Sequence, residues 1–205
     1  MHDAGCRGIA QVVDRAQAGG KRADLAHGLS AALRASKLGS LAQLYADARA
    51  HGPAWETLVA HLTIGETYFF RNQAQFDALR EQIVPELIAR RSSIRTLRIW
   101  SAGCATGEEP YSIAIYLLER WAQIDRYDVE ILSSDIDTTV LQAAQRGIYS
   151  ARSVSHLPHV YLRKYFTSHG DNEWRISRDL VDAVEFSRVN LSEPADTRRF
   201  RDIDV

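Results

Sequence analysis

The feature that most constrains this chain is a regular alternation of predicted strands and helices that begins at Thr96. The segment TLRIWSAG (96–103) predicts a strand, and EEPYSIAIYLLERW (108–121) predicts a helix. The same order follows in YDVEILSSD (127–135) and DTTVLQAAQRG (137–147). Strands separated by helices at this spacing form βαβ units with parallel strands. The sequence therefore predicts an α/β fold built on a parallel sheet.

The alternation is interrupted over residues 150–182, where we expect a small inserted subdomain. Within it, LPHVYLRKYF (157–166) predicts a helix, and NEWRISRDLV (172–181) has the alternation of a small antiparallel strand pair. The sheet resumes with AVEFSRVNL (183–191), and DIDV (202–205) predicts the start of a fourth strand. Because such a sheet leaves an edge exposed, we expect a C-terminally truncated piece of a longer protein or domain.

The N-terminal part of the chain predicts helices only. Residues 1–63 are rich in alanine, leucine and arginine, and leucines recur at roughly helical spacing. These leucines are Leu25, Leu29, Leu33 and Leu38. The predicted organisation is a helical domain over 1–63, a linker and connecting helix over 64–95, and the α/β domain over 96–205.

Composition narrows the class of protein. The net charge is −1 and the isoelectric point is about 6.7, so no global basic field favours nucleic acid as a partner. Two cysteines without a Cys/His cluster favour free thiols over a zinc site or a disulfide framework. No apolar run approaches the ~20 residues needed to span a membrane. We therefore expect a cytoplasmic protein with no bound metal and no direct membrane insertion.

The loop SAGCATGEE (101–109) follows the first predicted strand, where parallel sheets bind ligands. Small residues such as Gly103 let a ligand approach the backbone. Glu108 and Glu109 stand where a phosphate-binding loop carries lysine and serine or threonine, and they would repel a pyrophosphate. Asp135, after the second strand, suits the ribose hydroxyls of an adenosine. Acids of this kind favour S-adenosylmethionine, which is cationic and carries hydroxyls but no phosphate.

Structural roles for the same residues stay open at this point. The helix dipole favours both glutamates in a first turn whether or not a ligand binds, and Glu108 is the stronger candidate ligand of the two. Asp135 and Asp137 can also cap the following helix. Cys104 is interpreted as a small filler rather than a nucleophile, because no histidine lies near it in the sequence.

Three stretches of the chain resemble the CheR-type chemotaxis-receptor methyltransferases. TIGETYFFR (63–71) resembles that family's aromatic-arginine motif, and LRIWSAGCATGEEPYSIAI (97–115) resembles its cofactor loop. SSDIDTTVLQAAQRGIY (133–149) resembles its second strand, acid and helix. The chain departs from the family pattern at Gly65, where the family often has asparagine.

The resemblance implies a Rossmann-like methyltransferase domain with a small inserted β-subdomain, preceded by a helical substrate-recognition domain. It implies S-adenosyl-L-methionine as cofactor and S-adenosyl-L-homocysteine as product. Together with the glycine loop, it assigns cofactor binding to Thr67, Arg71, Gly103, Glu108, Asp135, Asn190 and Leu191. Of the aromatic residues 68–70, we expect at least two to pack in the core between the two domains.

The reaction implied by the resemblance is methyl transfer to glutamate side chains on the cytoplasmic helices of methyl-accepting chemoreceptors. A glutamate carboxylate is already ionised at neutral pH, so no general base is expected. Arg71 is the candidate catalytic residue, steering the substrate carboxylate, and a structural salt bridge is its alternative role. Arg34 and Lys37 on the N-terminal helix are candidates for binding the acidic receptor. The alternative function is a non-catalytic cofactor-binding or scaffolding module of a signalling protein.

Overall fold

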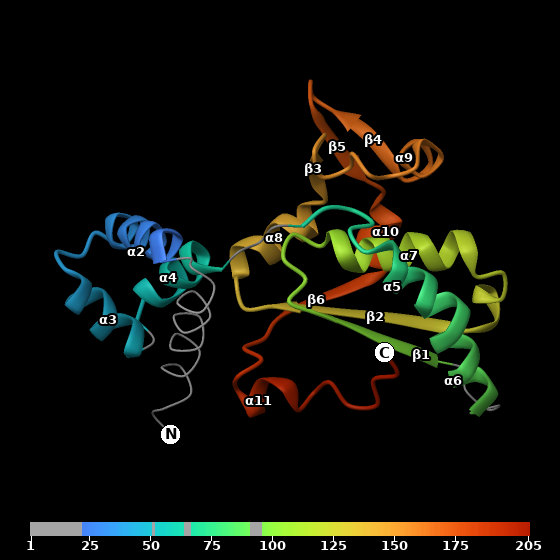
Figure 1. The fold of residues 1–205 in the computed structure, drawn as a ribbon, viewed down its shortest axis with the longest axis horizontal. Coiled ribbons are helices and arrows are strands. Elements are labelled where there is room, and N and C mark those ends of the chain that lie inside the picture. Colours follow the sequence, from blue (N-terminus) through green and yellow to red (C-terminus); the bar gives the residue numbers. More distant parts are fainter. Residues whose placement is uncertain (1–21, 51, 64–66, 91–95) are drawn as a thin grey trace. The chain divides into compact units, whose positions relative to one another are not determined.

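The computed structural model describes residues 22–50, 52–63, 67–90 and 96–205 (Figure 1). The chain divides into two compact units. The first contains the described parts of 1–64 together with 136–139 and 189–198, and the second contains the described parts of 65–135, 140–188 and 199–205. Among the described helices, none combines the length and apolar composition needed to cross a bilayer.

The described N-terminal part of the first unit is helical, as predicted. It comprises α2 (Arg22–Ser36), α3 (Leu41–Arg49) and α4 (Ala54–Leu62), and the unit also contains the short α11 (Pro194–Thr197). Helix α3 begins where the Ser40 hydroxyl accepts a hydrogen bond from the Gln43 amide. The buried core of this unit consists of Ala32, Leu44, Ala48, Ala54, Trp55, Leu58 and Val59.

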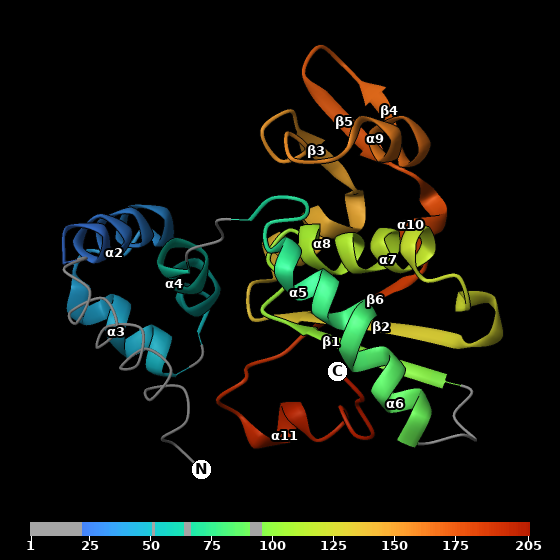
Figure 2. The same ribbon diagram turned by 45° about the vertical axis from the view of Figure 1, so that its right-hand side comes forward.

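The second unit is built on a parallel sheet of three described strands, which confirms the predicted α/β class. The strands are β1 (Thr96–Ala102), β2 (Asp128–Asp135) and β6 (Val184–Arg188), in the order β1-β2-β6. Helix α7 (Glu108–Arg120) and the short 3-10 helix η2 (Ile124–Arg126) connect β1 to β2, and α8 (Thr138–Arg146) follows β2. Figures 1 and 2 show α7 lying along one face of this sheet.

A second sheet is antiparallel, in the order β3-β5-β4. Its strands are β3 (Ile148–Ser150), β4 (Phe166–His169) and β5 (Glu173–Ile176), with α9 (His159–Tyr165) before β4 and α10 (Arg178–Asp182) after β5. In both ribbon views this sheet lies beyond α7, on the side away from the parallel sheet (Figures 1 and 2).

The predicted strand pair over 172–181 is only half right. Its first part forms β5, but its second part forms α10, and the partners of β5 are β3 and β4. Leu180 lies buried on α10, and α10 packs against α7 and β6. Packing of this apolar residue against a helix and a strand therefore overrides the local alternation.

The predicted strand over 202–205 does not form a regular strand, although its residues make hydrogen bonds to the outer edge of β1. The Asp204 amide donates to the Arg98 carbonyl over 2.9 Å, and the Trp100 amide donates to the Val205 carbonyl over 2.9 Å. The Arg98 amide instead donates to the side chain of Asp204. Asp202 has a left-handed φ of 55°. A bent backbone and a side-chain acceptor thus replace the expected ladder.

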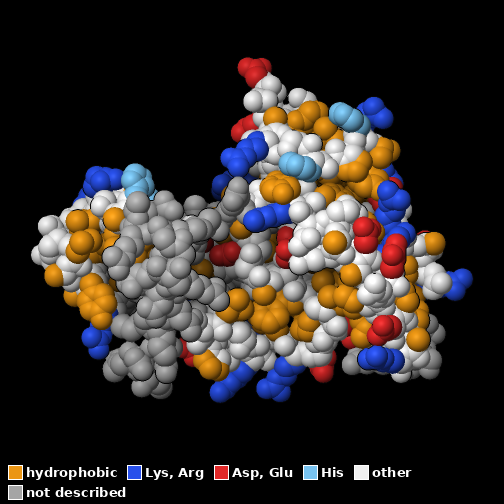
Figure 3. Space-filling model, viewed as in Figure 1, with side chains coloured by type: hydrophobic (Ala, Val, Ile, Leu, Met, Phe, Trp, Pro, Cys, Tyr) orange, Lys and Arg blue, Asp and Glu red, His pale blue; other side chains and the backbone are white. Residues whose placement is uncertain are grey.

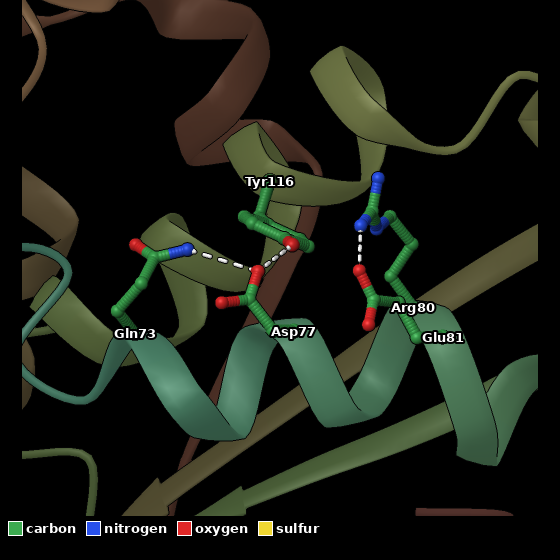
Figure 4. A network of polar contacts seen from close by, with 5 residues as sticks. All are labelled: Gln73, Asp77, Arg80, Glu81 and Tyr116. Atoms are coloured by element: carbon green, nitrogen blue, oxygen red, sulfur yellow. Dashed lines mark hydrogen bonds and ion pairs between the residues drawn. The ribbon is translucent and has the colours of Figure 1, made fainter.

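The connecting helix runs as α5 (Gln73–Ala78), the π-helical turn η1 (Leu79–Ile83) and α6 (Val84–Arg90). Pro85 sits at the second position of α6, directly after the π turn, where its missing N–H and its ring disturb regular α-helical bonding. Asp77 on α5 accepts hydrogen bonds from Tyr116 on α7 and from Gln73 (Figure 4). This contact joins the connecting helix to the helix that follows the candidate loop.

The Asp77–Tyr116 bond should make stability depend on pH at both ends of the scale. The Tyr116 hydroxyl holds the pKa of Asp77 below its ordinary value, so its stabilisation is complete above about pH 4 and fades as Asp77 protonates. Burial and Asp77 raise the pKa of Tyr116 to about 12, so its contribution fades above about pH 10, where the unfolded tyrosine ionises.

We therefore expect Tyr116→Phe to lower the melting temperature most between about pH 5 and pH 9. The difference from the wild type should shrink towards both extremes, and thermal melts across pH measure it. Tyr45→Phe is the matched control because Tyr45 is 52% exposed in α3. An equal difference at all pH values would contradict the assignment.

Candidate functional site

The loop after β1 is fastened to the end of β2. The amides of Gly103 and Cys104 donate to the Ser134 carbonyl over 2.7 and 2.9 Å. The Ala105 amide donates to the carboxylate of Asp135 over 2.8 Å. Because β1 and β2 are parallel neighbours, their carboxyl ends meet at one edge of the sheet. The structure thus brings Gly103 and Asp135 together at the edge where the sequence places a ligand.

The two glycines of this loop both have left-handed backbones, but for different reasons. Gly103 has a φ of 78°, and a Cβ added to it would meet no described atom within 4 Å. Gly107 has a φ of 91°, and its added Cβ would lie 2.9 Å from the Cβ of Ala144 and 3.1 Å from the ring of Tyr111. Gly107 therefore serves close packing at the start of α7, whereas Gly103 faces an open space.

The two glutamates at the start of α7 differ in accessibility. Glu108 is buried, and its carboxylate accepts hydrogen bonds of 2.6 Å from the hydroxyls of Thr106 and Ser153. Glu109 is exposed and accepts a bond of 2.7 Å from the Ser101 hydroxyl. Cofactor binding by Glu108 remains a prediction, but protein hydroxyls already contact both of its carboxylate oxygens. Glu109 is the more accessible acid at this edge.

The aromatic-arginine segment 67–71 is held in place by hydrogen bonds from its backbone amides to other parts of the chain. The Phe69 amide donates to the Ser153 carbonyl over 3.0 Å, and the Phe70 amide donates to the Ser112 hydroxyl over 3.0 Å. Phe70 has a φ of 58°, a conformation that costs a bulky residue about 1–2 kcal/mol. Phe69 and Phe70 are both buried, so core packing of two aromatic residues is confirmed, and the core in which they lie is that of the second unit.

The polar ends of this segment are more accessible. Thr67 is half-buried and Arg71 is exposed. The Tyr68 ring stacks on His156 with a centroid separation of 4.5 Å, and the Arg71 guanidinium carbon lies 5.9 Å from the centroid of the Tyr68 ring. Arg71 therefore presents a positive charge beside an aromatic surface.

Cys104 is a filler, as the sequence suggests. Its side chain is buried, and burial, aided by the negative charge of Asp135, raises the pKa of its thiol to about 12. Asp137 is a helix cap, because its carboxylate accepts a hydrogen bond from the Thr139 amide over 2.7 Å.

The remaining candidates belong to the first unit. Asn190 makes local contacts, accepting a hydrogen bond from the Ser192 amide over 3.0 Å, and Leu191 is 55% exposed. Arg34 and Lys37 are exposed on and just after α2. The basic side chains of the described residues that are visible in Figure 3 are scattered within each unit. Gly65 lies outside the described residues.

Sequence reasoning missed the serines that organise this region. Ser112 follows Glu108 by one helical turn, so the sequence predicts that the two residues lie on the same face of α7. Ser153 carries no such signal, because it lies 45 residues beyond Glu108 in a connection without periodicity. Only the folded chain shows that the two meet.

The α/β domain and the segment that precedes it match a known protein family. Residues 65–205 match the family described as CheR methyltransferase, SAM binding domain. The chain belongs to the CheR methyltransferase family. The match covers the loop, both strand ends and the aromatic-arginine segment.

Curated relatives of this chain are named chemotaxis protein methyltransferases. The chain is 40% identical over 157 residues to chemotaxis protein methyltransferase 2 of Vibrio cholerae, covering 77% of this chain and 54% of that protein. It is 37% identical over 170 residues to chemotaxis protein methyltransferase 2 of Pseudomonas aeruginosa, covering 80% and 58%. It is 36% identical over 157 residues to the chemotaxis protein methyltransferase of Salmonella typhimurium, covering 72% and 49%. The chain thus spans about half the length of these relatives.

The residues of the loop fit S-adenosylmethionine, the cofactor of the matched domain. The open space beside Gly103 allows a ligand to approach the backbone. The exposed Glu109 and the half-buried Asp135 suit a cationic, hydroxyl-bearing molecule, and residues 101–110 contain no lysine or arginine that would favour a phosphate. These hydrogen-bond acceptors therefore agree with the family's cofactor.

The raised pKa of Cys104 makes its thiol unreactive in the folded protein. A shift from 9.0 to about 12 lowers the thiolate fraction about a thousandfold. We expect negligible alkylation of Cys104 by iodoacetamide at pH 8 and complete alkylation in guanidinium chloride, measured by peptide mass spectrometry. Rapid labelling of the native protein would contradict this burial.

The two loop glycines should respond differently to alanine. Both substitutions cost about 1–2 kcal/mol because φ is positive. Gly107→Ala should cost more, because its Cβ meets Ala144 and Tyr111. Gly103→Ala should instead weaken binding of S-adenosylhomocysteine, since its Cβ projects into the open space. Denaturant melts measure the loss of stability in each variant, and calorimetric titration measures the affinity for S-adenosylhomocysteine. Unchanged affinity in Gly103→Ala would show that the ligand binds elsewhere.

Proposed function

We propose that the full-length protein containing this chain transfers methyl groups from S-adenosylmethionine to glutamate side chains of chemoreceptors. The observation that carries the proposal is an acid-lined glycine loop, placed at the edge of β1 and β2 in a CheR SAM-binding domain. The relatives are named chemotaxis protein methyltransferases, which supports the pathway. The acceptor helices lie in the cytoplasm, so the proposal also places the protein there.

Methyl transfer requires the protein mainly to bind and orient the two reactants. S-adenosylmethionine, when bound, supplies a methyl group activated by its positively charged sulfur. The acceptor glutamate is ionised at neutral pH and acts as nucleophile without a general base. Holding the reacting atoms in line provides most of the acceleration. Positioning residues therefore matter more than acid–base residues.

Roles follow from the accessibility of each candidate. Asp135 and Glu109 would bind the polar groups of the cofactor, and Thr67 would contribute from the aromatic-arginine segment. Arg71 carries the exposed charge of that segment, and would hold the acceptor carboxylate by charge and hydrogen bonding.

Substrate recognition is assigned to the first unit. Arg34 and Lys37 are exposed on the described helical part, and basic side chains suit an acidic receptor helix.

Asn190 and Leu191 are proposed for the adenine side of the cofactor, from the family resemblance. The domain limits given by the sequence, with an insertion over 150–182, remain part of the proposal.

The test uses the full-length protein, labelled S-adenosylmethionine and a receptor cytoplasmic domain. We expect base-labile label on the receptor. Asp135→Asn should lower the affinity for S-adenosylhomocysteine about tenfold or more, because a charged acceptor is lost. Asp125→Asn is the matched control, since Asp125 is exposed on η2 in the connection that precedes β2.

Two outcomes would revise the proposal. Cofactor binding without transfer to any receptor would indicate the non-catalytic binding module instead. Unchanged affinity in Asp135→Asn would show that the acid edge is not the cofactor site.

A further inference from the structure

We propose that the buried pair Glu108–Ser153 is a positioning device for the candidate site. It fixes segment 67–71 against the 103–107 loop. The Ser153 hydroxyl donates to one carboxylate oxygen of Glu108 over 2.6 Å, and the Thr106 hydroxyl donates to the other over 2.6 Å. The inference rests on the proposed function only where it concerns the rate of methyl transfer.

The carboxylate of Glu108 needs both hydroxyls. Glu108 is 3% exposed, and Ser153 and Thr106 are the donors to its side-chain oxygens among the described residues. Its place in the first turn of α7 adds a favourable helix dipole. A buried carboxylate that loses a donor loses stability and draws its neighbours into new positions. Glu108 therefore binds the loop to the connection that carries Ser153.

Segment 67–71 is attached to the same pair. Its Phe69 amide bonds the Ser153 carbonyl, and its Phe70 amide bonds the Ser112 hydroxyl. That hydroxyl also donates to the backbone carbonyl of Glu108 over 2.6 Å. Two successive amides of the segment thus converge on residues that are bonded to Glu108.

The backbone of the segment shows why such restraint is needed. Phe70 holds a left-handed φ of 58°, and such a conformation persists only where surrounding contacts determine it. Thr67 and Arg71 lie at the two ends of this segment, so relaxation at Phe70 would reorient both. A displacement of about 1 Å at a reacting site can cost about a hundredfold in rate.

The pair also reaches the second sheet. Ser153 lies on the connection from β3 to α9, and the Tyr149 hydroxyl of β3 donates to the Thr106 carbonyl over 2.9 Å. Two hydrogen bonds therefore join this connection and its strand to Glu108 and its loop. The geometry makes the second sheet a support for the loop.

The experiment substitutes Ser153→Ala in the full-length protein. Hydrogen exchange of the peptide containing 67–71 should become faster, and the affinity for S-adenosylhomocysteine, measured by calorimetry, should fall about tenfold or more. Ser153→Thr keeps the hydroxyl and should restore both. Ser168→Ala is the matched control, because Ser168 is exposed on β4 and its hydroxyl donates to the nearby Gly170 carbonyl.

Unchanged exchange or unchanged affinity in Ser153→Ala would overturn the proposal, as would equal effects in Ser168→Ala. If Ser153→Ala fails to fold, Glu108→Gln provides the same two measurements, because it keeps the shape of the side chain and removes its charge. Receptor methylation is assayed separately. A wild type that binds S-adenosylhomocysteine but labels no receptor refutes the proposed function, and exchange and affinity still decide the role of the pair.

Discussion

The structure around the candidate site depends on one buried carboxylate, that of Glu108. Burying a charge is unfavourable unless it is hydrogen-bonded, and here hydroxyls from the loop and from the β3–α9 connection supply the bonds. Both of these donors and the first turn of α7 must therefore be in place together. This requirement joins two separate stretches of chain, the loop with the start of α7 and the β3–α9 connection, at the edge of the parallel sheet. It also explains why an acid in a glycine loop need not be a ligand.

The parallel register of β1 and β2 determines where the accessible acids lie. Ala102 pairs with Ser134, so the two strands end together and the loop amides reach the Ser134 carbonyl and Asp135. The outcome is an open space at Gly103 bordered by acids. A cationic cofactor without phosphate suits that edge, and the match to the CheR SAM-binding domain agrees with it.

Most of the second unit could be predicted because its segments have clear periodicity and long apolar stretches. Strands β1, β2 and β6 and helices α7, α8 and α9 were all expected from the sequence. The expectation failed at 178–182, where packing of Leu180 overrides local alternation. It failed again at 202–205, where a left-handed Asp202 bends the chain. Both are short segments, in which tertiary contacts outweigh local preference.

The sequence by itself determined the α/β class and the chemical character of the loop, and it predicted the edge of the sheet at which a ligand would bind. These follow from local patterns and from the general geometry of parallel sheets. Only the tertiary structure decided which of two adjacent glutamates is accessible, because nine of the thirteen residues of α7 are buried and periodicity cannot separate the two. It alone revealed Ser153, since a hydrogen bond across 45 residues leaves no trace in local sequence.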